Sequence, residues 1–132
     1  MKAPMRVTDL DHVVLRCRAI DQTLEFYQRV LGLTEERRLD SIGLIQLRAG
    51  RSMLDLIPME PNDGGEAGGN LDHFCLGIET DDIAALARQL QEMGVEVLGE
   101  PQERYGARGT GWSVYIRDPE GNKVELKQVQ SV

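Results

Sequence analysis

The chain has 132 residues, a formal net charge of −7 at neutral pH and a hydrophobic share of 41%. This length predicts one domain, and the hydrophobic share is enough to build a core. The acidic balance, with no cluster of Lys and Arg, argues against nucleic-acid binding, and the absence of a long apolar run argues against a membrane span.

The first half of the chain predicts a strand, a helix and three further strands. Apolar and β-branched residues predict a strand over Val7–Arg18. Asp21 is expected to cap the helix that follows, and Gly32 to end it in a left-handed turn. The apolar residues on one face of this helix are Leu24, Tyr27 and Leu31. The three short strands are expected at Leu33–Leu39, Ile42–Arg48 and Arg51–Ile57.

The second half predicts the same order of elements. A strand is expected at Leu71–Glu79, and Asp81 or Asp82 can cap the next helix, which Gly94 ends. The apolar stripe of this helix is Ile83, Leu86, Ala87, Leu90 and Met93. The glycine-rich segment Glu103–Gly111 is either a mobile loop over the cleft, with Arg104 or Arg108 meeting an anionic substrate, or a solvated connection, and the second is expected. The last strands are expected at Val95–Gly99, Gly111–Arg117 and Lys123–Val129.

A three-residue phrase occurs once at the start of each half. Leu10-Asp11-His12 returns 61 residues later as Leu71-Asp72-His73. We therefore predict one α+β domain over residues 1–132, built from two βαβββ modules at about residues 7–57 and 71–129. Pro58–Asn70 contains four glycines and two prolines and is expected to link the modules.

Two histidines and two strand carboxylates occupy equivalent places in this repeat. His12 and His73 open the first strand of each half, and Asp55 and Glu125 lie in the last. Taken singly, each residue has a structural alternative, a hydrogen-bonded histidine or an acid on a solvated face. If the halves are related by a two-fold axis, the four side chains meet. Such a mixed N/O set suits a divalent ion of Mn, Fe, Co, Ni or Zn.

Cysteine usage and the N-terminus predict a cytoplasmic protein. The two cysteines, Cys17 and Cys75, do not make a disulfide framework and are expected to be small core residues. The segment Met1–Arg6 lacks the order of charged and apolar residues that a signal peptide has.

The sequence resembles the vicinal oxygen chelate superfamily from about Val7 to Gln128. The opening Leu-Asp-His-Val-Val-Leu, with Leu24-Glu25-Phe26-Tyr27 and Leu31-Gly32-Leu33, resembles the first module of that family. The run from Tyr115 to Leu126, with Asp118-Pro119-Glu120-Gly121, resembles its end. The resemblance implies paired modules that form a curled mixed sheet around a metal cleft, and it implies a homodimer.

The resemblance also implies roles for individual residues. The metal ligands of a glyoxalase-type site would be His12, Asp55, His73 and Glu125, although glyoxalase I usually has Glu where this chain has Asp55. Arg16 matches the position of an arginine that binds a carboxylate of the substrate. Glu125 would be the catalytic base, and Asp55 could share that role as its symmetric partner.

Three functions are compatible with this resemblance. The first is a lactoylglutathione lyase-like lyase or isomerase. It would use a divalent metal ion and act on a small α-hydroxycarbonyl or thiol adduct through a metal-bound enediolate. The second is a small extradiol-type dioxygenase with His12, His73 and Glu125 on iron. The third is a non-catalytic protein that sequesters a drug or another small ligand, as bleomycin resistance proteins do.

Overall fold

A computed structural model of the chain describes residues 6, 9–60 and 71–129. The chain forms two compact units, Met1–Glu60 and Pro61–Val132, and each is described by itself. Most of the predicted linker, at residues 61–70, and the start of the first predicted strand, at Val7, lie outside the described residues. Within the described part, no helix is long and apolar enough to cross a membrane.

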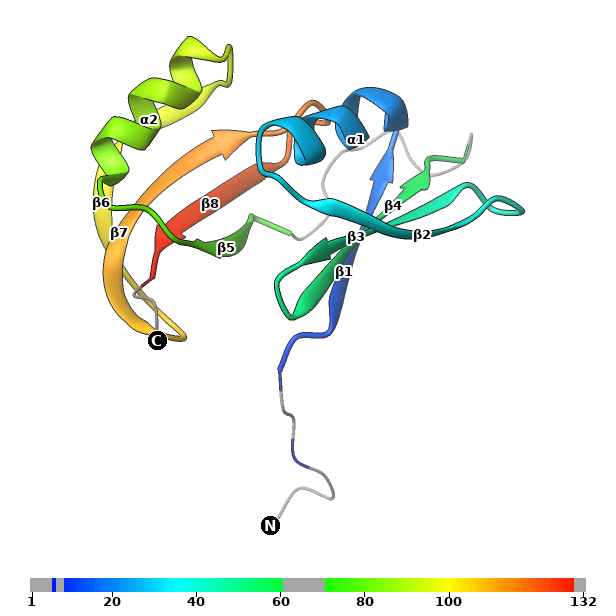
Figure 1. The fold of residues 1–132 in the computed structure, drawn as a ribbon, viewed down its shortest axis with the longest axis horizontal. Helices are drawn as coiled ribbons and strands as arrows, with labels where there is room; N and C mark the ends of the chain where they lie inside the picture. The colour runs from blue at the N-terminus through cyan, green and yellow to red at the C-terminus, as the bar shows by residue number, and fades with distance from the viewer. Residues whose placement is uncertain (1–5, 7–8, 61–70, 130–132) are drawn as a thin grey trace. The chain divides into compact units, whose positions relative to one another are not determined.

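The first unit is a four-stranded mixed sheet with one helix (Figure 1). Its strands lie in the order β1-β4-β3-β2, with β1 parallel to β4 and the other neighbours antiparallel. Helix α1 packs against β4. The elements are β1 (His12–Cys17), α1 (Ile20–Arg29), β2 (Thr34–Leu39), β3 (Leu44–Ala49) and β4 (Ser52–Pro58).

The second unit repeats this arrangement, but its second and third strands, β6 and β7, are longer than β2 and β3 of the first unit. Its sheet has the order β5-β8-β7-β6, with β5 parallel to β8, and helix α2 packs against β6 and β7. Figure 1 shows β7 as a strongly curved strand. The elements are β5 (Phe74–Ile78), α2 (Ile83–Glu92), β6 (Val97–Gly106), β7 (Gly109–Arg117) and β8 (Lys123–Gln128).

The two sheets confirm the predicted βαβββ repeat and the α+β class. Each first strand pairs in parallel with the last strand of its own unit, so the ends of one module lie side by side. The register is also repeated. Val14 lies opposite Asp55, and Cys75 lies opposite Glu125, and each of Val14 and Cys75 comes two residues after a histidine.

Alternating side chains give each sheet one apolar face, which carries the core. In the first unit, Phe26 and Tyr27 of α1 are buried and contact each other edge to face. In the second unit, α2 buries Ile83, Ala87 and Leu90, as its apolar stripe predicts. The buried apolar strand residues are Leu15, Cys17, Ile45, Leu47, Leu54 and Leu56 in the first unit, and Val114, Ile116, Val124 and Leu126 in the second.

Helix α1 differs from the prediction in its start and in its buried face. Ala19, not Asp21, occupies the N-cap position, and its carbonyl oxygen accepts a hydrogen bond from the Thr23 hydroxyl at 2.9 Å. Asp21 lies in the first turn, where its charge favours the helix dipole. The buried residues are Thr23, Phe26 and Tyr27, whereas Leu24 is only half-buried. Gly32 has the predicted left-handed conformation, with φ of 72°.

The first strand of each unit is shorter than predicted. β1 begins at His12 and β5 at Phe74, because β4 and β8 provide backbone partners only from those positions onward. His73 therefore lies one residue before its strand, whereas His12 is the first residue of its own. Both histidines thus stand at the point where strand pairing begins.

The segment Glu103–Gly111, expected to be a connection, is the end of a β-hairpin. β6 runs to Gly106 and β7 starts at Gly109, so only two residues form the turn. The sequence of β6 hides this strand because it contains Pro101 and a left-handed Gly99, with φ of 73°. A register shift between Leu98 and Gln102 absorbs both, as edge strands allow.

The N-cap of α2 provides a stability test. The Asp82 carboxylate accepts a hydrogen bond from the Ala85 N–H at 3.1 Å, which confirms one of the two predicted caps. Asp82→Ala removes the carboxylate and leaves the N–H of Ala85 without its hydrogen-bond partner. The substitution is therefore expected to lower the free energy of unfolding by about 1 kcal/mol in urea titrations. The control is Asp81→Ala, expected to cost less than about 0.5 kcal/mol. Equal losses would contradict the assignment of the cap.

Candidate functional site

In the first unit, a buried carboxylate lies beside the strand that carries His12. Asp55 of β4 is 4% exposed and lies opposite Val14 of β1. Its Oδ2 accepts a hydrogen bond from Gln46 Nε2 at 3.1 Å, while its Oδ1 is buried without a hydrogen-bond partner in the described structure. A buried carboxylate oxygen without a partner is unfavourable unless a cation or a proton balances it. Asp55 therefore has a free coordination position.

The imidazole of His12 is held from one side by the preceding residue. His12 Nδ1 lies 2.8 Å from Asp11 Oδ1. This hydrogen bond raises the pKa of His12, and the charge of nearby Asp55 raises it further. An imidazole that donates through Nδ1 to a carboxylate has Nε2 directed away from that partner, which is the usual arrangement of a metal-binding histidine.

In the second unit, a histidine and a buried glutamate face each other directly. His73 Nε2 lies 3.1 Å from Glu125 Oε1. Glu125 is 6% exposed, and its Oε2 accepts a hydrogen bond from the Ser113 hydroxyl at 2.7 Å. Two ligands of one zinc-type ion, each about 2.1 Å from it, lie roughly 3.0–3.4 Å apart at ordinary bond angles. The two side chains are hydrogen-bonded to each other, and their separation is also compatible with a shared divalent ion.

The other side of the His73 ring repeats the contact seen at His12. Asp72 Oδ1 lies 2.7 Å from His73 Nδ1 and 3.4 Å from Lys123 Nζ. The hydrogen bond from His73, and then the one from Lys123, hold the pKa of Asp72 below its ordinary value. Asp72 is therefore ionised at neutral pH and fixes the orientation of the imidazole. The Tyr115 ring contacts that imidazole edge to face.

Each unit thus holds one predicted imidazole and one predicted carboxylate: His73 contacts Glu125, and Asp55 lies near enough to His12 to raise its pKa. The donor types fit a divalent ion of the Mn to Zn series, because each pair combines an imidazole with a carboxylate. In the part of the chain that the structure describes, no group of three or more His, Cys, Asp or Glu side chains is gathered for a metal ion. A pair alone is therefore an incomplete site.

Arg16, the predicted substrate-binding residue, lies on the same face of β1 as His12. Residues 12, 14 and 16 alternate with the buried residues Leu15 and Cys17, and the Arg16 side chain is exposed. Its role in binding a substrate stays a prediction.

Three kinds of polar contact at the site were not foreseen from the sequence. They are the carboxylates of Asp11 and Asp72 on the histidines, the amide of Gln46 on Asp55, and the hydroxyl of Ser113 on Glu125. A signal existed for the first, because an aspartate precedes the histidine in both copies of the repeated phrase. Gln46 and Ser113 carry no such signal, since strand register alone brings them to the acids.

Cys75 corrects the expectation that both cysteines are core residues. Neither forms a disulfide in the described structure, but Cys17 is buried, whereas Cys75 is exposed and lies opposite Glu125. Partial burial, followed by the charge of Glu125, raises the pKa of the Cys75 thiol to about 11. The group is therefore a neutral thiol at physiological pH and not a nucleophile.

This shift predicts slow alkylation of an exposed cysteine. A raised pKa leaves less thiolate below pH 11, so Cys75 of chelator-treated protein is expected to have about one hundredth of the thiolate of an ordinary thiol at pH 8. Mass spectrometry after iodoacetamide treatment measures the rate, which should still increase between pH 9 and 11. Glu125→Gln should shift the profile to lower pH, and a plateau near pH 9 in the unsubstituted protein would contradict the assignment.

The family model of the Glyoxalase/Bleomycin resistance protein/Dioxygenase superfamily matches residues 9–126. The chain is 33% identical to a glyoxalase domain-containing protein of Mycosarcoma maydis, over 96% of this chain and 71% of that protein. It is 27% identical to a probable lactoylglutathione lyase of Synechocystis, over 91% of this chain and 95% of that protein.

A solved structure shows the same fold. The crystal structure of a virulence protein from Salmonella typhimurium aligns with a TM-score of 0.74 and 29% identity, over 96% of this chain and 100% of that chain. The match of the family model to nearly the whole chain agrees with the repeated modules and with the resemblance found in the sequence. The chain therefore belongs to the Glyoxalase/Bleomycin resistance protein/Dioxygenase superfamily.

Proposed function

We propose that the chain is a metal-dependent, glyoxalase-like lyase or isomerase. Its substrate would be a small α-hydroxycarbonyl or a thiol adduct, such as the hemithioacetal of methylglyoxal. The contact between His73 and Glu125, with a buried glutamate and an imidazole oriented by Asp72, carries this proposal. The name of the Synechocystis relative, a probable lactoylglutathione lyase, supports the same reaction class.

The proposed ligands of the metal ion are His12, Asp55, His73 and Glu125. The free Oδ1 of Asp55 and the separation of His73 from Glu125 fit a divalent ion, which could be Ni, Zn, Co, Mn or Fe. When bound, such an ion stabilises negative charge that develops on a substrate oxygen. The nitrogens that it would use are the Nε2 atoms, because Nδ1 of each histidine is held by an aspartate.

The chain's own residues would move the proton. Glu125 would remove the proton from the carbon next to the carbonyl and return it to the neighbouring carbon, so that the substrate is isomerised without an oxidant or reductant. Ser113 would keep Oε2 of Glu125 in place during both steps. Asp55 could share the role of base as the equivalent residue of the other module, and Arg16 would bind a carboxylate of the substrate.

The proposed assembly is a homodimer in the cytoplasm, and its only ligands in turnover are the metal ion and a small molecule. Members of this superfamily commonly act on small molecules, and the acidic composition of the chain argues against a nucleic-acid partner. Size-exclusion chromatography with light scattering tests the dimer.

Metal content tests the proposed function most directly. Protein purified without chelator is expected to contain one divalent ion per chain by elemental analysis, and His12→Ala and His73→Ala should each lose it. Loss in both variants requires that the two histidines serve the same ion. Retention of metal in either variant would contradict the proposed ligand set.

The same preparation separates the reaction classes. Nickel, zinc, cobalt or manganese with isomerisation of the methylglyoxal hemithioacetal supports the proposal. Iron with catechol-dependent oxygen uptake would replace it by the dioxygenase. Ligand binding by an unsubstituted protein that takes up no metal would replace it by sequestration.

A further inference from the structure

A buried lysine lies on the same face of the second sheet as Glu125. Lys127 of β8 is 4% exposed, and strand alternation places it two residues beyond Glu125 on that face. It lies opposite Ser113 of β7 and Gly77 of β5. Its ammonium makes no hydrogen bond or ion pair with any residue that the structure describes. Lys127 Nζ is not among the fully buried polar atoms without a partner, so the stem of the side chain is buried while its ammonium keeps contact with solvent and is accessible to an anion.

Two glycines shape the surroundings of this side chain. A Cβ atom added to Gly106 would lie 3.3 Å from Lys127 Cε, and one added to Gly111 would lie 3.3 Å from Lys127 Nζ. Together, Gly106 and Gly111 are here called the glycine cradle. Any larger residue at Gly111 would also lie 2.4 Å from the backbone oxygen of Gln128. The absence of a side chain at both positions of the glycine cradle leaves room for the lysine side chain.

A second cation without a carboxylate partner lies on this face. Arg104 of β6 is opposite Gly111 in the hairpin. Its guanidinium donates to the Tyr115 hydroxyl at 3.4 Å, to the Glu103 carbonyl oxygen at 3.0 Å and to the side-chain oxygen of Gln102. All three partners are neutral, and in the described structure Arg104 forms no ion pair. Two cations therefore lie on the face that carries Glu125, and neither forms an ion pair in the described structure.

We propose that Lys127, supported by Arg104, forms a subsite for an anionic group of the substrate, a carboxylate or a phosphate. This inference rests on the proposed function in one respect, because Glu125 is taken as the base. Residues two apart in a strand are separated by about 6.5–7 Å. The anionic group would therefore lie about that far from the carbon atom that Glu125 deprotonates, and an uncharged substrate of the same size would bind less tightly.

Anion binding by the metal-free protein tests the subsite without using turnover. Inorganic phosphate and acetate are titrated separately into the full-length, chelator-treated protein, and the backbone amide signals of Gly106, Gly111 and Lys127 are followed by NMR. At least one anion is expected to give saturable shifts. Saturation by acetate alone assigns a carboxylate subsite, and saturation by phosphate alone assigns a phosphate subsite.

Two substitutions with the same change in net charge give the decisive comparison. Lys127→Met keeps the length of the side chain, removes its charge and should weaken anion binding about tenfold or more. Lys123→Met is the control, because Lys123 lies on the same strand but already contacts Asp72. The affinity of the Lys123→Met variant for the anion should equal that of the unsubstituted protein. Equal affinities in the unsubstituted protein and Lys127→Met, or the absence of saturable shifts with both anions, would overturn the subsite.

These outcomes are separable from those of the proposed function. Anion binding that depends on Lys127, in a protein that takes up no metal, would retain the subsite and overturn the metal-dependent reaction. Metal binding and turnover, together with anion binding that does not depend on Lys127, would retain the metal-dependent reaction and overturn the subsite. If both hold, Lys127→Met should raise KM about tenfold for a carboxylate-bearing or phosphate-bearing hemithioacetal and leave KM for an uncharged one unchanged.

Discussion

The Glu125→Gln variant is expected to lose about 10²–10⁴-fold in kcat toward the hemithioacetal of methylglyoxal, the range observed when a general base is removed. The amide keeps the size of the side chain and can still accept the hydrogen bond from Ser113. It cannot take up a proton from the substrate, and it is a weak ligand for a divalent ion. Steady-state kinetics with metal in excess, together with elemental analysis, separates the two losses.

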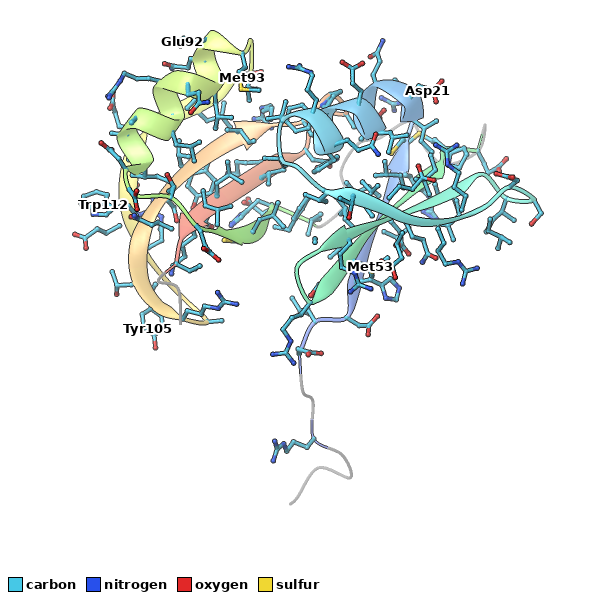
Figure 2. All side chains as sticks on the ribbon, viewed as in Figure 1. Asp21, Met53, Glu92, Met93, Tyr105 and Trp112 are labelled. Carbon is cyan, nitrogen blue, oxygen red and sulfur yellow. The ribbon has the colours of Figure 1, made fainter. Side chains whose placement is uncertain are left out.

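Two further variants locate the origin of this effect. Glu92→Gln makes the same chemical change at the exposed end of α2 (Figure 2) and is expected to leave kcat unchanged. Ser113→Ala removes the positioning hydrogen bond and should reduce metal affinity about 10–100-fold, as loss of a partner to a metal ligand usually does. A Glu125→Gln variant with the kcat of the unsubstituted protein would eliminate Glu125 as the base.

The Gly111→Ala variant is expected to lower the free energy of unfolding by about 2–3 kcal/mol, because its Cβ would lie 2.4 Å from the Gln128 backbone oxygen. A backbone atom in a paired strand cannot move aside without disturbing the pairing of β7 with β8. The side chain of Lys127 would also have to shift, since its Nζ lies within 3.3 Å of the same position. Urea unfolding of metal-free protein measures the loss.

A glycine with a different constraint provides the control. Gly99 has a left-handed φ of 73° but open space around its missing Cβ. Gly99→Ala should therefore cost only the backbone penalty, roughly 1–2 kcal/mol. Gly111→Ala should be the more damaging substitution even though its backbone is not left-handed. The opposite order would show that the close approach at Gly111 is relieved cheaply.

The exposed aromatic residues of the second unit do not belong to this site. Tyr105 is 85% exposed near the hairpin turn, and Trp112 is 45% exposed on β7. Figure 2 shows both at the outer edge of their unit. Strand alternation places Trp112 on the opposite face from Ser113, so the face that carries Glu125 and Lys127 has Tyr115 beside His73 and lacks Trp112.

The sequence by itself determined the repeat and the family. The two copies of Leu-Asp-His, the helical spacing of Ile83, Ala87 and Leu90 and the turn at Gly32 are short-range patterns, and each one predicted its element. Local patterns of this kind depend on backbone preference and on the alternation of buried side chains, which a window of a few residues records.

Tertiary structure alone decided which polar groups meet. His73 and Glu125 are 52 residues apart, and their contact follows from where β5 and β8 pair. The contact of Glu125 with Ser113 on β7 and the position of the glycines around Lys127 depend on the same register. A shift of one residue in that register would move these side chains to the other face of the sheet. The strands at Val95–Gly99 and Gly111–Arg117 were predicted, but their extension over residues 100–106 and 109–110 was not. Cross-strand pairing stabilises this polar edge strand with its proline, and a short sequence window does not record such pairing.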